Sequence, residues 1–220
     1  MYSSILTDAT GIVARDDSTR NIVIAIRGSQ SVRNWIANAA FSLRTATFCS
    51  GCKSHTGFLA SAQEVLPRVR ATVNSLKQQY PNYGIVFTGH SFGGALATLL
   101  AADFRSRGQR ADLFTYGAPR VGNQALSDFI GNSALGRTFR VHHKEDPVSR
   151  IPPKILGYGY INPEYRIKVT SANTQASDIE VIQTTTKEIN LFNLNFDDHG
   201  YYLGPTDISA CGDGQFEWKV

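Results

Sequence analysis

The residues Gly89-His90-Ser91-Phe92-Gly93 are the part of this chain from which its chemistry can first be inferred. They follow an apolar run, residues 83–88, and precede a run of small residues, 94–101, that is typical of a helix. A serine on a sharp strand-to-helix turn needs glycines two residues before and after it, because the neighbouring backbones pass too close for a Cβ atom. We interpret the motif as a nucleophile elbow, and the alternative is a chance G-x-S-x-G.

A serine hydroxyl is a weak nucleophile until a histidine takes its proton, and that histidine must be oriented by an acid. In hydrolases built on such an elbow the acid and the histidine follow the serine in the chain. The histidines after Ser91 are His142, His143 and His199. The first two fall within a predicted strand, whereas His199 lies in a late polar turn. His199 is therefore the predicted base, and a surface loop histidine is the alternative.

The acid is expected directly after a strand, and Glu145 and Asp146 both follow the predicted strand at 137–143. Because adjacent side chains of an extended segment point opposite ways, only one of the two can face the histidine. Asp146 is preferred because Pro147 restricts its backbone. Glu145 is then a solvated neighbour. Asp112 is assigned to a strand edge and Asp128 to a helix surface. Asp197 and Asp198 are too close to His199 in the chain to be preferred.

An ester-cleaving serine also needs hydrogen-bond donors for the oxyanion of the tetrahedral intermediate. The amide of Phe92 directly follows the serine, at the N-terminus of the predicted helix, and is the first predicted donor. Ser29 follows the apolar strand that ends at Ile26 and could supply the second. On sequence alone an ordinary turn at Ser29 is an equal alternative.

Three cysteines are present, and two of them are close in the chain. The spacing of Cys49 and Cys52 suits a tight disulfide, a redox C-x-x-C motif, or half of a zinc site that could include His55. A structural disulfide is preferred, because a redox motif normally opens a helix after a strand and a zinc site would need two further ligands besides His55. Cys211 has no predicted partner in the chain.

The spacing of apolar residues predicts strands and helices in alternation. A hairpin is predicted at 11–27, a helix that Pro67 kinks or splits at 57–80, and the elbow helix up to about residue 108. Further strands and one helix follow: strands at 111–116, 137–143, 165–169 and 179–182, and a helix at 122–130. This order predicts an α/β fold with a central, mostly parallel sheet, helices on both faces, and a site at the carboxyl ends of the strands.

The composition indicates one domain, residues 1–220, because a chain of 220 residues with 42% hydrophobic content can bury one substantial core. The 22 basic and 18 acidic residues are spread along the chain without a run of like charge, which argues against a nucleic-acid partner. No apolar stretch is long enough for a transmembrane helix. The first residues also lack the features of a signal peptide.

The combined motifs resemble those of the fungal class 3 lipases, which are α/β-hydrolases. The resemblance runs from about Tyr2 to Cys211, and its motifs lie at 26–29, 34–36, 49–52, 87–98, 116–123 and 146–153. It implies a triad of Ser91, Asp146 and His199 and the oxyanion donors Ser29 and Phe92.

The resemblance also implies a lid at about 32–39, a short amphipathic helix that opens at a lipid surface. Its substrate-binding residues would be Val32, Trp35 and Ile36. The implied activity is hydrolysis of triacylglycerol esters at a lipid–water interface, with no cofactor or metal, by a secreted monomer whose disulfide is Cys49–Cys52. The alternatives are a feruloyl or other soluble esterase on the same fold, and an inactive lipid-surface binder.

The family has an N-terminal helix and a strand before the point that matches Met1. We therefore expect a chain that lacks the family's N-terminal segment and leaves apolar surface uncovered. The resemblance pairs the cysteine at Cys211 with one in that segment. The residues after Cys211 match nothing in the family pattern.

Overall fold

A computed structural model describes residues 2–3, 9–28, 40–169, 174–184, 196–200 and 202 of the chain. Ser29, the predicted lid with Val32, Trp35 and Ile36, and Cys211 lie outside the described residues. No helix of the described part is both long and apolar enough to cross a bilayer.

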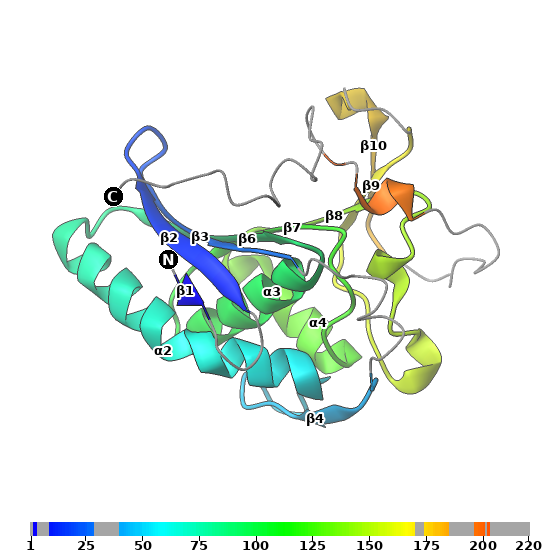
Figure 1. Ribbon diagram of the computed structural model, residues 1–220, viewed down its shortest axis with the longest axis horizontal. Coiled ribbons are helices and arrows are strands. Elements are labelled where there is room, and N and C mark those ends of the chain that lie inside the picture. Colours follow the sequence, from blue (N-terminus) through cyan, green and yellow to red (C-terminus); the bar gives the residue numbers. More distant parts are fainter. Residues whose placement is uncertain are drawn as a thin grey trace.

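Within the described residues, the centre of the molecule is an eight-stranded sheet in the order β1-β2-β3-β6-β7-β8-β9-β10 (Figure 1). Neighbouring strands from β3 to β9 are parallel, and β1, β2 and β10 add antiparallel edges. The strands are β1 (Tyr2–Ser3), β2 (Thr10–Asp16), β3 (Asn21–Ile26), β6 (Gly84–His90), β7 (Asp112–Tyr116), β8 (Thr138–His143), β9 (Glu164–Ile167) and β10 (Ile179–Ile182). The predicted hairpin and each later predicted strand are confirmed.

Three α-helices are described: α2 (Thr56–Gln79), α3 (Ser91–Ser106) and α4 (Gln124–Gly131). A short hairpin of β4 (Leu43–Thr45) and β5 (Lys53–His55) precedes α2. The sequence predicted that Pro67 kinks or splits this helix, and the structure shows that α2 is not split but runs on through Pro67. Proline frees the carbonyl four residues earlier, which belongs to Gln63, and both residues are exposed on the solvent side of the helix.

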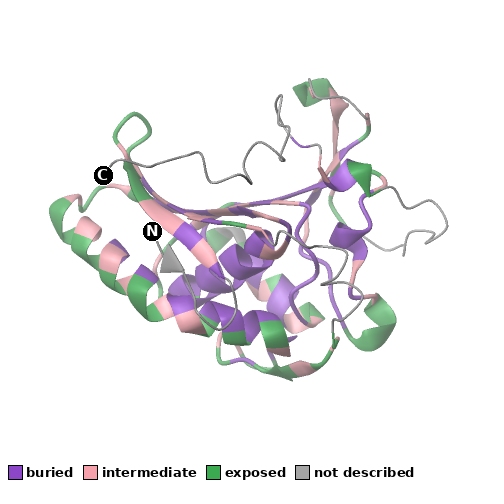
Figure 2. Cartoon of the chain, viewed as in Figure 1, coloured by how far each residue is buried: buried purple, intermediate pink, exposed green. Residues whose placement is uncertain are grey.

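The main core lies between one face of the sheet and helices α2 and α3 (Figure 2). Strand β3 alternates strictly between half-buried and buried residues. Its Ile22 and Ile24, and Phe87 of the adjacent strand β6, are at most 1% exposed. Helix α3 is buried along nearly its whole length.

The opposite face of the sheet carries half-buried apolar side chains, including Val23 and Val86. On this face Phe114 stacks on Phe139, with ring centroids 4.7 Å apart, and Phe139 contacts Tyr165. The helices α2, α3 and α4 all lie on the other side of the sheet (Figure 1). The α/β-hydrolase prediction is confirmed, but within the described part of the chain helices cover one face instead of two.

Candidate active site

Ser91 stands at the junction of β6 and α3 with φ +55°, a left-handed conformation that side-chain-bearing residues rarely adopt. A Cβ atom at Gly89 would lie 2.5 Å from the carbonyl carbon of Gly93, and one at Gly93 would collide with the carbonyl oxygen of Ile26. Both glycines are therefore required by close backbone approach. This strained strand-to-helix turn is the geometry expected of a nucleophile elbow.

Asp146 and His199 are brought together from positions far apart in the chain. His199 Nδ1 lies 2.9 Å from Asp146 Oδ2, and the Asp146 side chain is fully buried. The other carboxylate oxygen, Oδ1, accepts a 2.8 Å hydrogen bond from the amide of Val148. If Nδ1 of a neutral His199 donates to the carboxylate, Nε2 carries the lone pair that a proton acceptor needs.

Tyr202 is a residue of this site that the sequence reasoning missed. Its hydroxyl donates a 2.6 Å hydrogen bond to Asp146 Oδ2, the same oxygen that faces His199, and accepts one from the amide of His143. Burial, followed by the Asp146 charge, raises the pKa of the Tyr202 hydroxyl well above its usual value. The tyrosine is 56 residues from Asp146 in the chain, so no local pattern could have paired them.

Opposing effects act on the Asp146 carboxyl. Burial raises its pKa, but hydrogen bonds from His199 and Tyr202, the His199 charge and the Val148 amide together hold the pKa below its ordinary value. Asp146 is therefore a carboxylate that its surroundings keep ionised. Such a group can stabilise an imidazolium across a 2.9 Å contact.

His90, the residue before the nucleophile, is a second residue that the sequence did not assign. Its ring lies 4.5 Å from the ring of His199, and its Nε2 donates a 2.8 Å hydrogen bond to the His199 backbone oxygen. Burial, together with the nearby His199, lowers the pKa of His90 to about 4. His90 is thus neutral at pH 7 and links the elbow to the turn that carries His199.

Neither Ser91 Oγ nor His199 Nε2 has a hydrogen-bond partner within the described part of the chain. The hydrogen bond expected between a serine nucleophile and a histidine base is therefore not formed between these two atoms. In hydrolases without substrate such contacts are often long and become shorter when the substrate binds.

Phe92 occupies the first turn of α3, where the free backbone amide groups form the positive end of the helix dipole. Its half-buried ring packs against Phe58 of α2, with centroids 5.9 Å apart. The Phe92 side chain thus packs against the core, while its backbone amide lies at the elbow. The second predicted donor, Ser29, is outside the described residues and stays a prediction.

A second histidine–aspartate contact lies beside the first. His143 Nδ1 is 2.8 Å from Asp198 Oδ2, and both side chains are 1% exposed. The same Asp198 oxygen accepts a hydrogen bond from the amide of Glu145. Residues 143–146, at the end of β8 and just after it, are therefore joined to the turn 197–199 by two buried contacts, Asp146 with His199 and Asp198 with His143.

The remaining acids have other partners. Glu145 is half-buried and lies 3.8 Å from Lys144 Nζ, and Asp112 pairs with Arg137. Asp128 accepts from Gln124 on the exposed side of α4. The assignment of these residues to structural or surface roles agrees with the structure.

Cys49 and Cys52 form a disulfide with a Cα–Cα distance of 5.3 Å, as the preferred prediction held. His55, the residue weighed as a zinc ligand, is the N-cap of α2 and accepts amide hydrogen bonds from Gly57 and Phe58. In the portion of the chain that is described, no group of three or more His, Cys, Asp or Glu side chains is arranged to hold a metal ion.

The comparisons with known proteins agree on a family. Residues 23–156 match the family described as Lipase (class 3). Among curated relatives, a "Secreted mono- and diacylglycerol lipase 1" of Fusarium solani is 44% identical over 75% of this chain and 50% of its own length. A "Lipase" of Rhizomucor miehei is 35% identical over 92% of this chain and 57% of its own length. The chain spans about half the length of these relatives.

A solved structure of a mono- and diacylglycerol lipase from Aspergillus oryzae superposes with a TM-score of 0.84, at 34% identity, over 94% of this chain and 80% of that one. Another, described as a buried polar cluster in a family of fungal lipases, gives a TM-score of 0.87 at 36% identity, over 96% of this chain and 80% of its own. The strained elbow, the matched residues and these superpositions agree with one another. The chain therefore belongs to the class 3 lipase family.

Proposed function

We propose that this protein is a serine carboxylester hydrolase that acts on acylglycerols, in the manner of a triacylglycerol lipase. The observation that carries the proposal is the pairing of a buried Asp146–His199 contact with a serine on a strained elbow. The family membership and the names of its relatives support the same activity. No cofactor is needed for this chemistry.

In the proposed reaction Ser91 Oγ attacks the ester carbonyl carbon while His199 Nε2 takes the hydroxyl proton. The imidazolium that forms is stabilised by Asp146 through Nδ1. The carbonyl oxygen becomes an oxyanion, for which the Phe92 amide and Ser29 are the proposed donors. His199 then protonates the departing alkoxide, and an acyl-serine remains.

Water releases the acyl group by the same route in reverse. His199 Nε2 accepts a proton from water, and the resulting hydroxide attacks the acyl carbon. The second tetrahedral intermediate collapses with return of the proton to Ser91 Oγ. A carboxylic acid leaves, and the site is restored.

We place this reaction at a lipid–water interface, with residues 32–39 as the lid and Val32, Trp35 and Ile36 as its lipid-facing residues. The sequence of this segment supports the proposal, because it separates apolar from polar side chains at helical spacing. We further propose that the enzyme is a secreted monomer. The Cys49–Cys52 disulfide and the word "secreted" in the names of relatives support secretion.

The test is hydrolysis of emulsified tributyrin and of soluble p-nitrophenyl butyrate by the unaltered chain and by Ser91→Ala. We expect Ser91→Ala to lower kcat on both esters by at least about 10⁴-fold, since the nucleophile is removed. Ser127→Ala is the matched control, because Ser127 is also buried but lies on α4. Full activity in Ser91→Ala would overturn the proposal, and a preference for the soluble ester with no rise in rate at the emulsion surface would exclude a lipase.

A further inference from the structure

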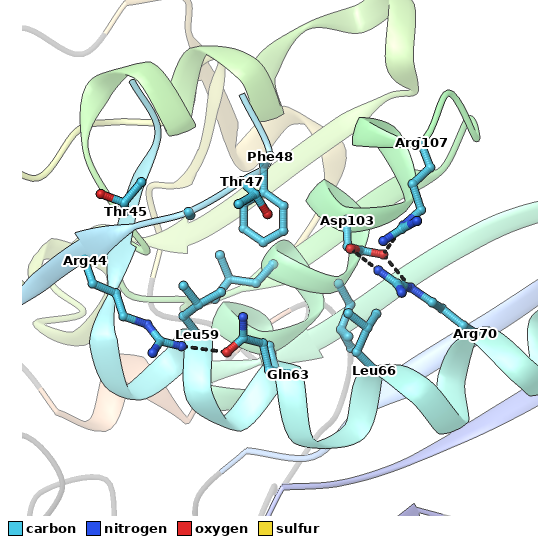
Figure 3. Close-up of a pocket in the computed structure, with 14 residues that line it drawn as sticks. Arg44, Thr45, Thr47, Phe48, Leu59, Gln63, Leu66, Arg70, Asp103 and Arg107 are labelled. Atoms are coloured by element: carbon cyan, nitrogen blue, oxygen red, sulfur yellow. Dashed lines mark hydrogen bonds and ion pairs between the residues drawn. The ribbon is translucent and has the colours of Figure 1, made fainter. Parts of the chain in front are cut away.

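A pocket of about 330 Å³ lies between α2, the second half of α3 and the segment 44–48 that begins in β4 (Figure 3). Its apolar lining comes from both helices and from that segment. Leu59, Ala62, Leu99 and Leu100 are at most 4% exposed, and the half-buried Phe48 and Leu66 complete the lining.

This pocket is distinct from the candidate active site. Ser91 begins α3, whereas Leu99, Leu100 and Asp103 lie in its second half. With a rise of about 1.5 Å per residue, they lie roughly 12–18 Å from Ser91 along the helix axis. A molecule in the pocket would not touch the elbow.

The charged residues that line the pocket are three arginines, Arg44, Arg70 and Arg107, and one acid, Asp103. Arg70 donates to both carboxylate oxygens of Asp103, and Arg107 Nε lies 3.4 Å from Asp103 Oδ2. The Asp103 carboxylate thus lies at one end of the pocket and forms ion pairs with both of these arginines (Figure 3). The lining keeps an excess of positive charge.

Arg44 lies at the other end of the pocket and pairs with a neutral partner (Figure 3). Its Nη2 donates a 2.6 Å hydrogen bond to Gln63 Oε1. Gln63 accepts through its amide oxygen and therefore keeps its NH₂ group as a donor. A guanidinium beside an amide NH₂ is a donor set that suits a carboxylate.

We propose that this pocket binds a medium-chain fatty acid anion, with the carboxylate at Arg44 and Gln63 and the alkyl chain over Leu59, Leu66 and Phe48. A volume of about 330 Å³ lies near the lower limit of about 300 Å³ for ligand pockets, which favours a chain of medium length. The proposal rests on the proposed function only for the source of the ligand, since ester hydrolysis releases such an acid. The binding itself does not require Ser91.

The test is isothermal titration of the full chain, carrying Ser91→Ala, with decanoate below its critical micelle concentration. Decanol and decyltrimethylammonium serve as the neutral and cationic probes of equal chain length. We expect saturable binding of decanoate and at least tenfold weaker binding of the other two probes. Equal binding of all three would show an unspecific apolar surface and overturn the proposal.

Two variants locate the ligand within the pocket. Gln63→Glu keeps an acceptor for Arg44 but repels a carboxylate, and Ala62→Trp fills the apolar lining without changing charge. Each is expected to weaken decanoate binding at least tenfold. Arg107→Gln, at the opposite end, is the matched control and is expected to change the affinity less than threefold.

Decanoate binding that is unchanged in Gln63→Glu would place the ligand outside this pocket and overturn the proposal, even if Ala62→Trp fails to fold. Each substitution is also made in the chain with Ser91 intact, where hydrolysis of the soluble ester should be unaffected. This separates the two proposals. Loss of the ester hydrolase assignment would leave the titration result standing, and the reverse also holds.

Discussion

Within the described residues, two buried histidine–aspartate contacts lie side by side, and only one of them adjoins Ser91, the proposed nucleophile. Asp146 contacts His199 at 2.9 Å, and Asp198 contacts His143 at 2.8 Å. The two pairs share residue types, burial and the same two chain segments. They differ in one respect, because His199 Nδ1 forms a hydrogen bond with Asp146, whereas His143 Nδ1 lies near Asp198 without hydrogen-bond geometry.

The difference lies in what surrounds each imidazole ring. The ring of His199 lies against His90, which directly precedes Ser91. The ring of His143 instead meets Tyr202 edge-on, with centroids 6.4 Å apart. A histidine–aspartate pair can therefore act in catalysis only where the second nitrogen of the imidazole ring lies near a group whose proton it can take. Elsewhere the same kind of pair can hold two segments of the chain together.

The largest effect expected in this comparison is on the first pair. Asp146→Asn keeps the shape of the side chain but removes the charge that stabilises an imidazolium, and we expect kcat on p-nitrophenyl butyrate to fall by about 10³–10⁴-fold. Steady-state kinetics at pH 8, with circular dichroism to verify folding, measures it. A folded variant with more than a tenth of the original kcat would remove Asp146 from the triad.

The second pair should respond much less. Asp198→Asn is expected to lower kcat about tenfold, because it weakens the contact that holds the turn of His199 against the segment after β8. The free energy of unfolding should fall by about 1–3 kcal/mol, as for a buried charged hydrogen bond. Glu145→Gln, at the half-exposed neighbour, is the control. A loss as large as that of Asp146→Asn would mean that the two pairs do not differ in role.

Tyr202 touches both pairs, and its removal sharpens the distinction. Tyr202→Phe deletes the hydrogen bond to Asp146 Oδ2, so kcat should fall by up to about tenfold. Because that bond helps to lower the pKa of Asp146, its loss should raise this pKa and move the acid limb of the kcat profile to higher pH. An unchanged acid limb in a pH series from 3 to 8 would show that the Tyr202 hydroxyl does not act on Asp146.

The last effect is on stability and not on kcat, and it concerns the pH dependence that His90 contributes. The pKa of His90 is lowered from 6.5 to about 4 in the folded state, so the unfolded chain binds more protons between these values. Stability contributed by neutral His90 is present above pH 6.5 and is lost as the pH falls toward 4, by up to about 1.4 kcal/mol per pH unit. His90→Asn should remove this slope, which urea unfolding at pH 7.0, 6.0 and 5.0 would reveal. Identical slopes in both chains would contradict it.

Local patterns in the sequence predicted much of this arrangement. The elbow follows from glycine spacing, the choice of Asp146 over Glu145 from its place after β8 and before Pro147, and the disulfide from Cys49 and Cys52. Each of these depends on neighbours within a few residues. The fold class followed from the alternation of strand and helix patterns.

Contacts between distant segments could not be predicted in the same way. Tyr202, His90 and the His143–Asp198 pair depend on partners 55 to 109 residues away that only the folded sheet brings together. The apolar run of β3 suggested helices on both faces, yet Val23 is half-buried and no described helix covers it. Apolar composition alone does not reveal which face a helix covers.

The close approach of Gly93 to the Ile26 carbonyl limits which substitutions this chain can accept. The backbone of the elbow lies directly against the end of β3, and no side chain separates the two backbones. A larger residue at position 93 would therefore force one of the two backbones to shift. A saturation library across 89–93 should therefore return a sharply uneven profile, in which glycine alone survives at 89 and 93 and several apolar residues survive at 92. Mutational tolerance would then map the backbone contacts of the turn, residue by residue, without any measurement of the reaction itself.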